Sequence, residues 1–489
     1  MTTRRSSSRS LIPMKRFALA GLTALPLLLA GCATPFLKST VEVPGRFASA
    51  AVSAEDPEAA WWEGFGDPVL TDLILRAARE NRDIRIAAER VRAARAGEVA
   101  SRSWLFPSVG LSASGVDRGT GYDSAVKRAV PTAADFKSAS GSVDVSWEID
   151  LAGRLRAAAS AAEAQTMAAE HGVRGVRLLV LTDVATNYFT LTGALRQLET
   201  VRAIAAAQDD TLRLVTARQR VGLATSFDVE RAQTEASRAH AAIPPLETIA
   251  AVSRHRIAVL IGDQAVHAAS VTPWTGEAVA PPARPGQPAA LLQRRPDLLA
   301  LQAQLDAANW RRKEAAAEWF PRLLVGALFG RFGMNLNGAS LGSARFSNAS
   351  GLLSMPVFNS GRTQAINDIA ESGQSEALYR YEDAIVRALE DVENALVTLG
   401  DEGRRAEALK NASASAESAL GRAQSLYDRG QIDLLPLLDA QRARLAARLG
   451  SNDSNTRVLL DSVQLYKALG GGWQAFEPPA ASAPRSPNS

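Results

Sequence analysis

The chain has 489 residues, 55 basic and 51 acidic side chains, and a formal net charge of +4. Five basic residues and no acidic ones lie in the first 31 positions, which leaves 50 basic and 51 acidic side chains in the rest of the chain. Because the rest of the chain has no excess of positive charge, we do not expect it to bind nucleic acid. The length predicts about two to four domains.

The first 31 residues have the pattern of a secretion signal. Lys15 and Arg16 precede an Ala- and Leu-rich stretch that is too short for a comfortable membrane-spanning helix. The stretch ends in Leu-Ala-Gly-Cys, which resembles the bacterial lipobox. We therefore expect a lipoprotein signal peptide over 1–31 and a lipid on the thiol of Cys32. Ala33, by resemblance to lipoprotein sorting rules, implies the outer membrane; a chance cysteine near a signal is the alternative.

Residues 32–60 contain three prolines and read as a lipid-anchored tether. Beyond Cys32 no run of 18 apolar residues occurs, so any membrane crossing should be made by strands. Residues 61–262 form a first repeat: helices, strands near 108–117 and 141–151 around an exposed loop, and a long helical hairpin that turns at 220–228.

The second predicted strand feeds directly into the hairpin. Residues 142–151 alternate polar and apolar side chains, which is typical of a strand with a different solvent on each face. After Gly153 about 70 residues follow without a proline, enough for a helix of roughly 100 Å. Val184, Tyr188, Leu191, Leu195 and Leu198 are spaced like a coiled-coil seam.

The same order of elements recurs in the second half. Gly153 and Gly222 match Gly361 and Gly430 at a spacing of 208 residues. We expect a connecting segment at 263–290, a second repeat at 291–470 and a flexible tail at 471–489. The second repeat should contain strands near 322–333 and 346–357 and a hairpin that turns at 429–433.

Four strands of this length cannot close a barrel, and open strand edges are not tolerated in lipid. The sequence therefore predicts that several copies of the chain contribute strands to one barrel, with the long helices packed into a wall on one side of the membrane. The copy number does not follow from the residues themselves.

Several motifs in this order resemble the outer membrane efflux factors, the TolC-like family, and in particular the OprM/NodT lipoprotein branch. They are Trp61-Trp62 through Asp67-Pro68, Trp147 to Arg154, Arg294 to Leu298, Leu437 to Arg442 and Tyr466 to Trp473. The resemblance implies an α+β membrane protein with a trimeric 12-stranded β-barrel, four strands per protomer, continued by an α-helical coiled-coil barrel. As partners it implies the homotrimer, a periplasmic adaptor (membrane fusion protein), an inner-membrane pump of the resistance-nodulation-division (RND) type and outer membrane lipid.

The resemblance also points to a gate. Leu435, Asp439 and Arg442 share one helical face by their spacing. The matching positions of the family line the closed periplasmic tip, where threefold repetition makes a carboxylate ring and an apolar ring across the pore. A surface ion pair beside a core leucine is the alternative interpretation.

The two hairpin turns are the second predicted site. They could be simple connections, whereas the family interpretation makes them the surfaces that receive the adaptor. Gly222 and Gly430 would allow close approach of helices, and Ser226 or Asp228 could cap the next helix. The residues of this expected site are Arg220, Val221, Gly222, Leu223, Ser226, Asp228, Arg429, Gly430, Gln431, Ile432 and Asp433.

Nothing in the sequence supports catalysis. The four histidines lack metal-ligand spacing, and no phosphate loop or nucleophile elbow occurs, so we expect neither an enzyme nor a cofactor. The predicted function is the exit duct of a tripartite drug or solute exporter in the cell outer membrane, extending into the periplasm. The outlet of a type I protein secretion system and a non-conducting coiled-coil scaffold lipoprotein are the alternatives.

Overall fold

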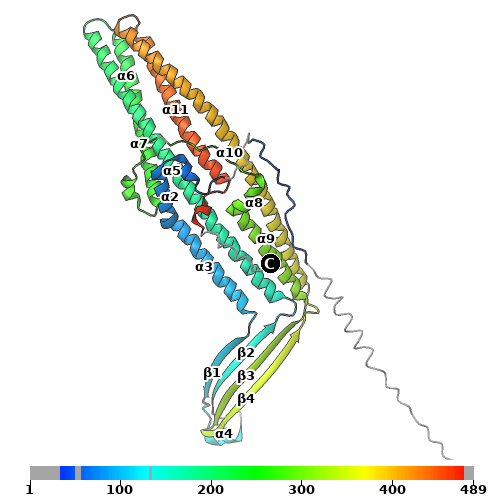
Figure 1. The fold of residues 1–489 in the computed structure, drawn as a ribbon. Helices are drawn as coiled ribbons and strands as arrows, with labels where there is room; N and C mark the ends of the chain where they lie inside the picture. The colour runs from blue at the N-terminus through cyan, green and yellow to red at the C-terminus, as the bar shows by residue number, and fades with distance from the viewer. Residues whose placement is uncertain (1–33, 50–56, 131–134, 277, 478–489) are drawn as a thin grey trace, which may run out of the picture. The chain divides into compact units, whose positions relative to one another are not determined.

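The computed structural model describes residues 34–49, 57–130, 135–276 and 278–477 (Figure 1). The chain divides into two compact units. The sheet unit comprises the chain up to Lys38, Ala96–Ala164 and Leu305–Leu378. The helical unit comprises Ser39–Arg95, Gln165–Gln304 and Tyr379 onward. Each unit therefore draws on both halves of the sequence. Cys32, the predicted lipid site, lies outside the described residues.

The order of the elements confirms the two structural repeats. The first is α3 (Arg82–Ser103), β1 (Ser108–Arg118), β2 (Phe136–Ile149), α5 (Arg154–Arg220) and α6 (Ser226–Ala241). The second is α9 (Pro296–Ala316), β3 (Arg322–Leu336), β4 (Ala339–Ser354), α10 (Arg362–Asp428) and α11 (Leu434–Ala468). Helices α5 and α10 each have 67 residues.

Shorter elements surround the repeats. They are η1 (Trp61–Phe65), α2 (Pro68–Glu80), α4 (Ser124–Ala129), α7 (Ile243–Leu260), η3 (Ala265–Ser270), η4 (Pro288–Ala290), α8 (Leu291–Arg294), η5 (Ala317–Trp319) and η6 (Trp473–Phe476).

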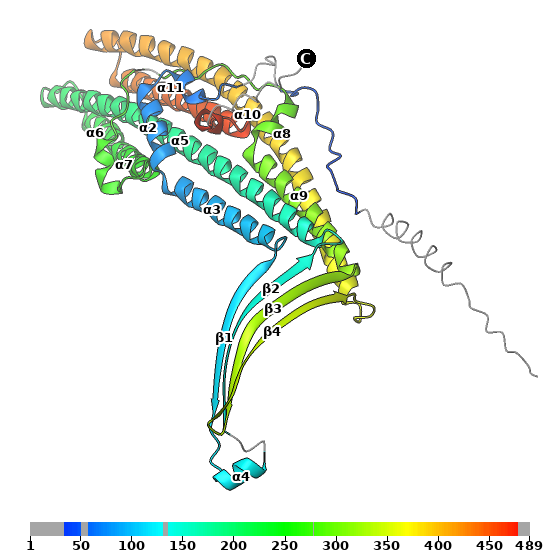
Figure 2. The same cartoon turned by 60° about the horizontal axis from the view of Figure 1, so that its bottom comes forward.

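The sheet is a four-stranded antiparallel meander in the order β1-β2-β3-β4 (Figure 2). One face of β1 and β2 carries hydroxyl pairs, such as Ser112 with Ser142 at 2.8 Å between the Oγ atoms. The register places Val109 beside Val145 and Val143 beside Phe329 on the opposite face. The sheet thus has one face with polar side chains from β1 and β2 and one that is mainly apolar, as the alternation predicted.

The strands are longer than their predicted bounds. β2 begins at Phe136 instead of 141, β3 continues to Leu336 instead of 333, and β4 occupies 339–354 instead of 346–357. Gly- and Ser-rich stretches that were interpreted as loops therefore extend the ladder, because their backbone groups are paired by neighbouring strands. The exposed loop predicted between the first two strands also contains the short helix α4.

The junction between β2 and α5 explains one of the sequence motifs. Gly153 has a positive φ of 77°, which favours glycine. The Asp150 carboxylate accepts hydrogen bonds from the backbone N–H groups of Leu155 (3.2 Å) and Arg156 (3.0 Å) at the start of α5. Burial would raise the pKa of Asp150, but these hydrogen bonds hold it below its usual range. Arg154 pairs with Glu148 at 2.8 Å, so side chains on both sides of the turn fix the direction in which the helix leaves the strand.

The main core of the helical unit is built on the aromatic residues of η1. Trp61 stacks on Tyr466 of α11 with ring centroids 5.3 Å apart, and Phe65 contacts Phe189 of α5 at 4.9 Å. Side chains of α2, α3, α5, α7 and α11 complete this buried cluster. The double tryptophan motif therefore joins the first residues of the first repeat to the last helix of the second.

The predicted coiled-coil seam on α5 is wrong as a description of its packing. Val184, Tyr188 and Leu191 are fully buried, but so are Ala185 and Phe189 between them, which makes a broad globular face. An 18-residue window of α5 reaches a mean hydropathy of 1.2, enough by length and composition to cross a membrane, yet 61% of that window is buried inside the protein. Burial in the core of the helical unit accounts for this apolar character.

The two hairpins differ in their returning helices. In the second repeat α11 is one continuous helix, whereas in the first repeat α6 ends at Ala241 and α7 starts at Ile243. Pro244 and Pro245 follow this break, and proline is tolerated in the first turn of a helix but not in its interior.

Both ends of the described chain are held by side chains. In the sheet unit Asn309 binds the backbone N–H and carbonyl of Leu37 at 3.0 and 3.2 Å. In the helical unit Glu393 accepts a hydrogen bond from the backbone N–H of Ser49. At the other end the Trp473 indole donates to the Arg294 carbonyl at 3.0 Å, so residues 471–477 are packed and not part of a flexible tail.

Candidate functional site

The two hairpin turns have the same backbone geometry. Gly222 and Gly430 have φ values of 77° and 69°, which place both in the left-handed region. After α5 the N–H groups of Gly222 and Leu223 bond back to Gln219 and Arg218, and after α10 those of Gly430 and Gln431 bond to Tyr427 and Leu426. Both turns are therefore Schellman motifs that satisfy the last carbonyls of a long helix.

The cap of α6 differs from the prediction. Thr225 is the N-cap, and its hydroxyl accepts a hydrogen bond from the Asp228 N–H at 3.2 Å. The Asp228 carboxylate accepts a hydrogen bond from the Thr225 N–H at 2.9 Å, which completes a capping box. The hydrogen bonds from Thr225 lower the pKa of Asp228. Asp228 is thus the partner of the cap, while Ser226 lies in the first turn and is exposed.

The turn side chains divide into an exposed set and a buried set. Val221 and Leu223 of the first turn are exposed, and so is Phe227, which the sequence analysis did not select. In the second turn Ile432 is half-buried, and Leu434 directly after the turn is buried, so the second turn exposes less apolar surface than the first. Arg220, Arg429, Gln431 and Asp433 are exposed.

The two glycines do not serve close packing within the protomer. A Cβ atom added to Gly222 or Gly430 would have no neighbour within 4 Å. Their positive φ angles therefore explain their presence in the protomer. Close approach of a partner helix remains a prediction.

A buried apolar cluster joins the two turns within the helical unit. It combines Val215 of α5 and Ala232 of α6 with Tyr427 of α10 and Leu437 and Leu438 of α11. The Arg218 guanidinium lies 4.3 Å from the centroid of the Tyr427 ring and adds a cation–π contact. We call this group the tip cluster. It makes the two hairpin ends one packed body.

The three predicted gate residues lie on the face of α11 that the tip cluster leaves uncovered. Leu435 is 44% exposed and Asp439 is exposed, whereas their neighbours Leu437 and Leu438 are buried. The structure brings Asp439 and Arg442 together, with 3.2 Å between Oδ1 and Nη1. Because Leu435 is not part of the core, the alternative interpretation of a core leucine is wrong for this residue.

Arg442 also connects the two hairpins. Its guanidinium donates to the Glu235 carboxylate of α6 at 2.7 Å, and the Glu235 side chain is only 10% exposed. This hydrogen bond is the main reason that the pKa of Glu235 lies below its usual range, and it raises the pKa of Arg442. Sequence reasoning missed Glu235, because no spacing rule relates residues on helices of different halves.

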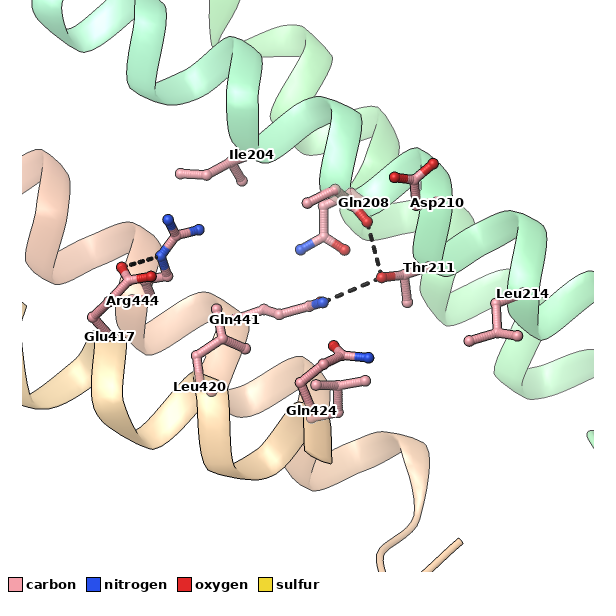
Figure 3. Close-up of a pocket in the computed structure, with 13 residues that line it drawn as sticks. Ile204, Gln208, Asp210, Thr211, Leu214, Glu417, Leu420, Gln424, Gln441 and Arg444 are labelled. Carbon is pink, nitrogen blue, oxygen red and sulfur yellow. Dashed lines mark hydrogen bonds and ion pairs between the residues drawn. The ribbon is translucent and has the colours of Figure 1, made fainter. Parts of the chain in front are cut away.

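A pocket of about 470 Å³, lined by both apolar and polar side chains, lies between α5, α10 and α11 (Figure 3). The Gln441 side chain points into it and donates to the Thr211 hydroxyl at 3.2 Å. Arg444 and Glu417 form an ion pair at its wall. The side-chain amide oxygens (Oε1) of Gln208 and Gln441 are buried and have no hydrogen-bond partner among the described residues. The pocket therefore offers hydrogen-bond acceptors between the two hairpins, close to the helical turns that carry the predicted gate.

Among the residues that the structure describes, no group of three or more His, Cys, Asp or Glu side chains could hold a metal ion. The geometry of the tips consists of exposed apolar and charged side chains on rigid turns. Such surfaces suit protein docking and ion passage.

A four-stranded antiparallel sheet with two open edges, continued by hairpins of very long helices, defines an outer membrane channel whose barrel is shared between protomers. A family model described as "Outer membrane efflux protein" matches residues 73–263 and 288–471. The chain belongs to this family and is an outer membrane efflux channel.

Relatives and solved structures agree with this assignment. The pyoverdine export outer membrane protein OpmQ of Pseudomonas putida is 32% identical over 469 residues, which cover 94% of this chain and 98% of the relative. The cation efflux system protein CusC of Escherichia coli is 28% identical over 457 residues, which cover 92% of this chain and 97% of the relative. The structure of the outer-membrane channel OprN matches with a TM-score of 0.81 and 28% identity, over 90% of this chain and 99% of that one.

These similarities confirm the predicted fold class, a trimeric 12-stranded barrel with a helical extension. They place the chain among the outer membrane components of efflux pumps and outside enzyme families.

Proposed function

We propose that the protein is the exit duct of a tripartite exporter and receives its substrates from a periplasmic adaptor and an RND-type inner-membrane pump. The duct itself supplies no energy: substrates move passively through its pore, and the pump provides the free energy for export. The observation that carries the proposal is the pair of like-built turns, each with exposed side chains and both fixed to the tip cluster. A rigid, apolar and charged surface of this kind is what a helical partner needs for docking.

In this proposal Leu435 and Asp439 form rings across the closed tip of the trimer, and Arg442 holds Asp439 and Glu235. A ring of carboxylates binds cations, and an apolar ring resists wetting. Cys32 carries the lipid that adds to the anchoring by the barrel. Substrate choice lies in the pump, because relatives named for pyoverdine export and for cation efflux resemble this chain over nearly all of its length.

The test is complementation in a strain that lacks its own outer membrane efflux channels. Expression of this chain together with a periplasmic adaptor and an RND-type pump from the same source should raise the minimal inhibitory concentration of the pump's substrates. Expression of the adaptor and pump alone should not. If a secreted polypeptide appears in the medium and drug resistance does not change, the chain is instead the outlet of a type I secretion system.

A further inference from the structure

Four large apolar side chains are exposed at the end of the sheet where the strands join the helices. Trp104 and Phe106 precede β1 and are 71% and 69% exposed, and Val357 and Phe358 follow β4 and are 93% and 87% exposed. All four belong to the sheet unit. Exposed apolar groups of this size mark a contact surface.

These side chains are presented by ordered turns. The Trp147 indole donates to the Leu105 carbonyl at 3.0 Å, which ties the turn before β1 to the neighbouring strand. After β4, Ser360 and Gly361 both have positive φ angles, and the Asn359 amide donates to the Thr363 hydroxyl at 2.6 Å. The exposure of the apolar side chains is therefore a property of fixed backbone.

The strand order of the sheet determines which residues of the neighbouring protomer lie beside these turns. Among the residues that the structure describes, β1 pairs only with β2 and β4 only with β3, so each outer strand has one edge of unpaired backbone groups (Figure 2). In the trimeric barrel the β4 edge of one protomer pairs with the β1 edge of the next. The strands alternate in direction, so this pairing is antiparallel. The residues that follow β4 therefore lie beside the residues that precede β1 of the neighbouring protomer.

The ends of the two strands are also at the same height. Ser108 lies on one rung with Ser146, Gly326 and Ser350, and β4 continues four residues further to Ser354. Barrel strands tilt by about 35–45°, so a level of the barrel shifts along the ladder by roughly one residue per strand. Three such steps lead from β1 to β4 and account for the extra residues. Ser108 and Ser354 thus mark one level of the barrel.

We propose that Trp104 and Phe106 of one protomer pack against Val357 and Phe358 of the next. We call this contact the clasp; three copies of it join adjacent protomers at the base of the barrel. The clasp continues the backbone pairing of the two edges below the last rung. It shields the apolar side chains that the isolated protomer exposes. Its partner is a second copy of this chain; the competing occupant of the same surface is membrane lipid.

Cysteine cross-linking in the full-length, membrane-inserted protein tests the clasp. The double variant Phe106→Cys/Val357→Cys, treated with a short bismaleimide, should give covalent dimers and trimers after boiling in SDS. Each single variant controls for Cys32 and should give monomers. The matched pair Val116→Cys/Val357→Cys, with one cysteine near the far end of β1, should also stay monomeric. Monomers alone from the first pair, in samples that run as trimers before boiling, would overturn the proposal.

Two further measurements keep the clasp testable if the cysteine pair disturbs assembly. Phe358→Ser should lower the temperature at which the trimer dissociates in SDS, whereas Val266→Ser, at an exposed valine in η3, should not. A bimane label on Val357→Cys should be shielded from brominated lipid. Quenching as strong as that of a label on Leu111→Cys, on the apolar sheet face, would assign the surface to lipid and refute the clasp.

Discussion

Asp67 shows how one side chain can account for a sequence motif. Its carboxylate accepts hydrogen bonds from the N–H groups of Val69 and Leu70 at the start of α2, at 2.9 and 3.0 Å. The other oxygen accepts the buried Tyr188 hydroxyl at 2.6 Å, and burial together with this hydrogen bond raises the pKa of Tyr188. One residue thus caps a helix and satisfies a buried hydroxyl.

We expect Asp67→Ala to destabilise the helical unit by about 2–4 kcal/mol, since it removes both the cap and the partner of Tyr188. Thermal unfolding followed by circular dichroism measures the loss. Asp72→Ala is the matched control: Asp72 lies on the same helix in an exposed ion pair with Arg76 at 3.9 Å, and its removal should cost less than about 1 kcal/mol. Equal effects of the two substitutions would contradict this account of Asp67.

The link between Arg442 and Glu235 makes the tips sensitive to acid. Arg442→Ala leaves Glu235 buried with Arg238, at 3.2 Å, as its remaining ion-pair partner among the described residues. We expect a loss of about 1–2 kcal/mol in the stability of the hairpin ends, measured by hydrogen exchange of α6 and α11. Arg442→Lys should recover part of the loss, because it keeps the charge.

The sign of the pH effect follows from the direction of the shift. The folded-state pKa of Glu235 lies below its usual value of 4.5. The stabilisation is therefore complete above pH 4.5 and is lost as the pH falls through the lower, folded-state pKa. In Glu235→Gln this acid dependence should disappear from the exchange of α6; an unchanged pH profile would show that another group is responsible.

At the scale of elements, the hairpin turns allow backbone conformation and docking to be separated. Gly222→Ala strains the positive φ by about 1 kcal/mol but adds only a methyl group. Gly222→Glu adds the same strain together with a charged side chain in open space. We expect Gly222→Ala to keep drug export and Gly222→Glu to abolish it, with the trimer intact in both. Normal export by Gly222→Glu would exclude this turn as the adaptor site.

The elements themselves were largely predictable from sequence because their patterns are local. Period-two alternation located the first two strands, and the internal repeat located the other two. The spacing of 208 residues between Gly153 and Gly361 marked the starts of two helices of equal length. The extra strand residues at 339–345 pair with β3 across a tight turn and were missed because the stretch is rich in Gly and Ser. Those at 136–140 could not be predicted, since their ladder bonds to β3 come from residues distant in the sequence. The pairing of Arg442 with Glu235 escaped prediction for the same reason.

Errors of packing had a different origin. The four-three spacing on α5 is real, but the residues between its positions are buried as well, because η1, α2, α7 and α11 pack around the helix. Periodicity states which side chains are apolar and not how many neighbours surround them. The cap at Thr225 was missed because Ser226 and Asp228 are equally good capping residue types, and only the backbone decides between them.

For the whole channel, the decisive prediction concerns current. If Asp439 forms a ring across the closed tip, Asp439→Ala should raise single-channel conductance in a planar lipid bilayer and weaken the selectivity for cations. Asp433→Ala, at an exposed carboxylate at the start of α11, is the matched control and should leave the conductance unchanged. Equal conductance of Asp439→Ala and the parent protein would place the constriction elsewhere.

The equal length of α5 and α10 has a consequence for how the protein evolves. The two helices occupy equivalent places in the two repeats, yet among the described residues the main core of the helical unit uses side chains of α5 and none of α10. The α5 helix is constrained by a crowded aromatic interior, whereas α10 lies outside that interior and buries separate side chains, such as Ile385, Val392 and Tyr427. Across relatives, the exposed positions of α10 should therefore diverge faster than α5, so that one repeat preserves the fold while the other adapts to new partners.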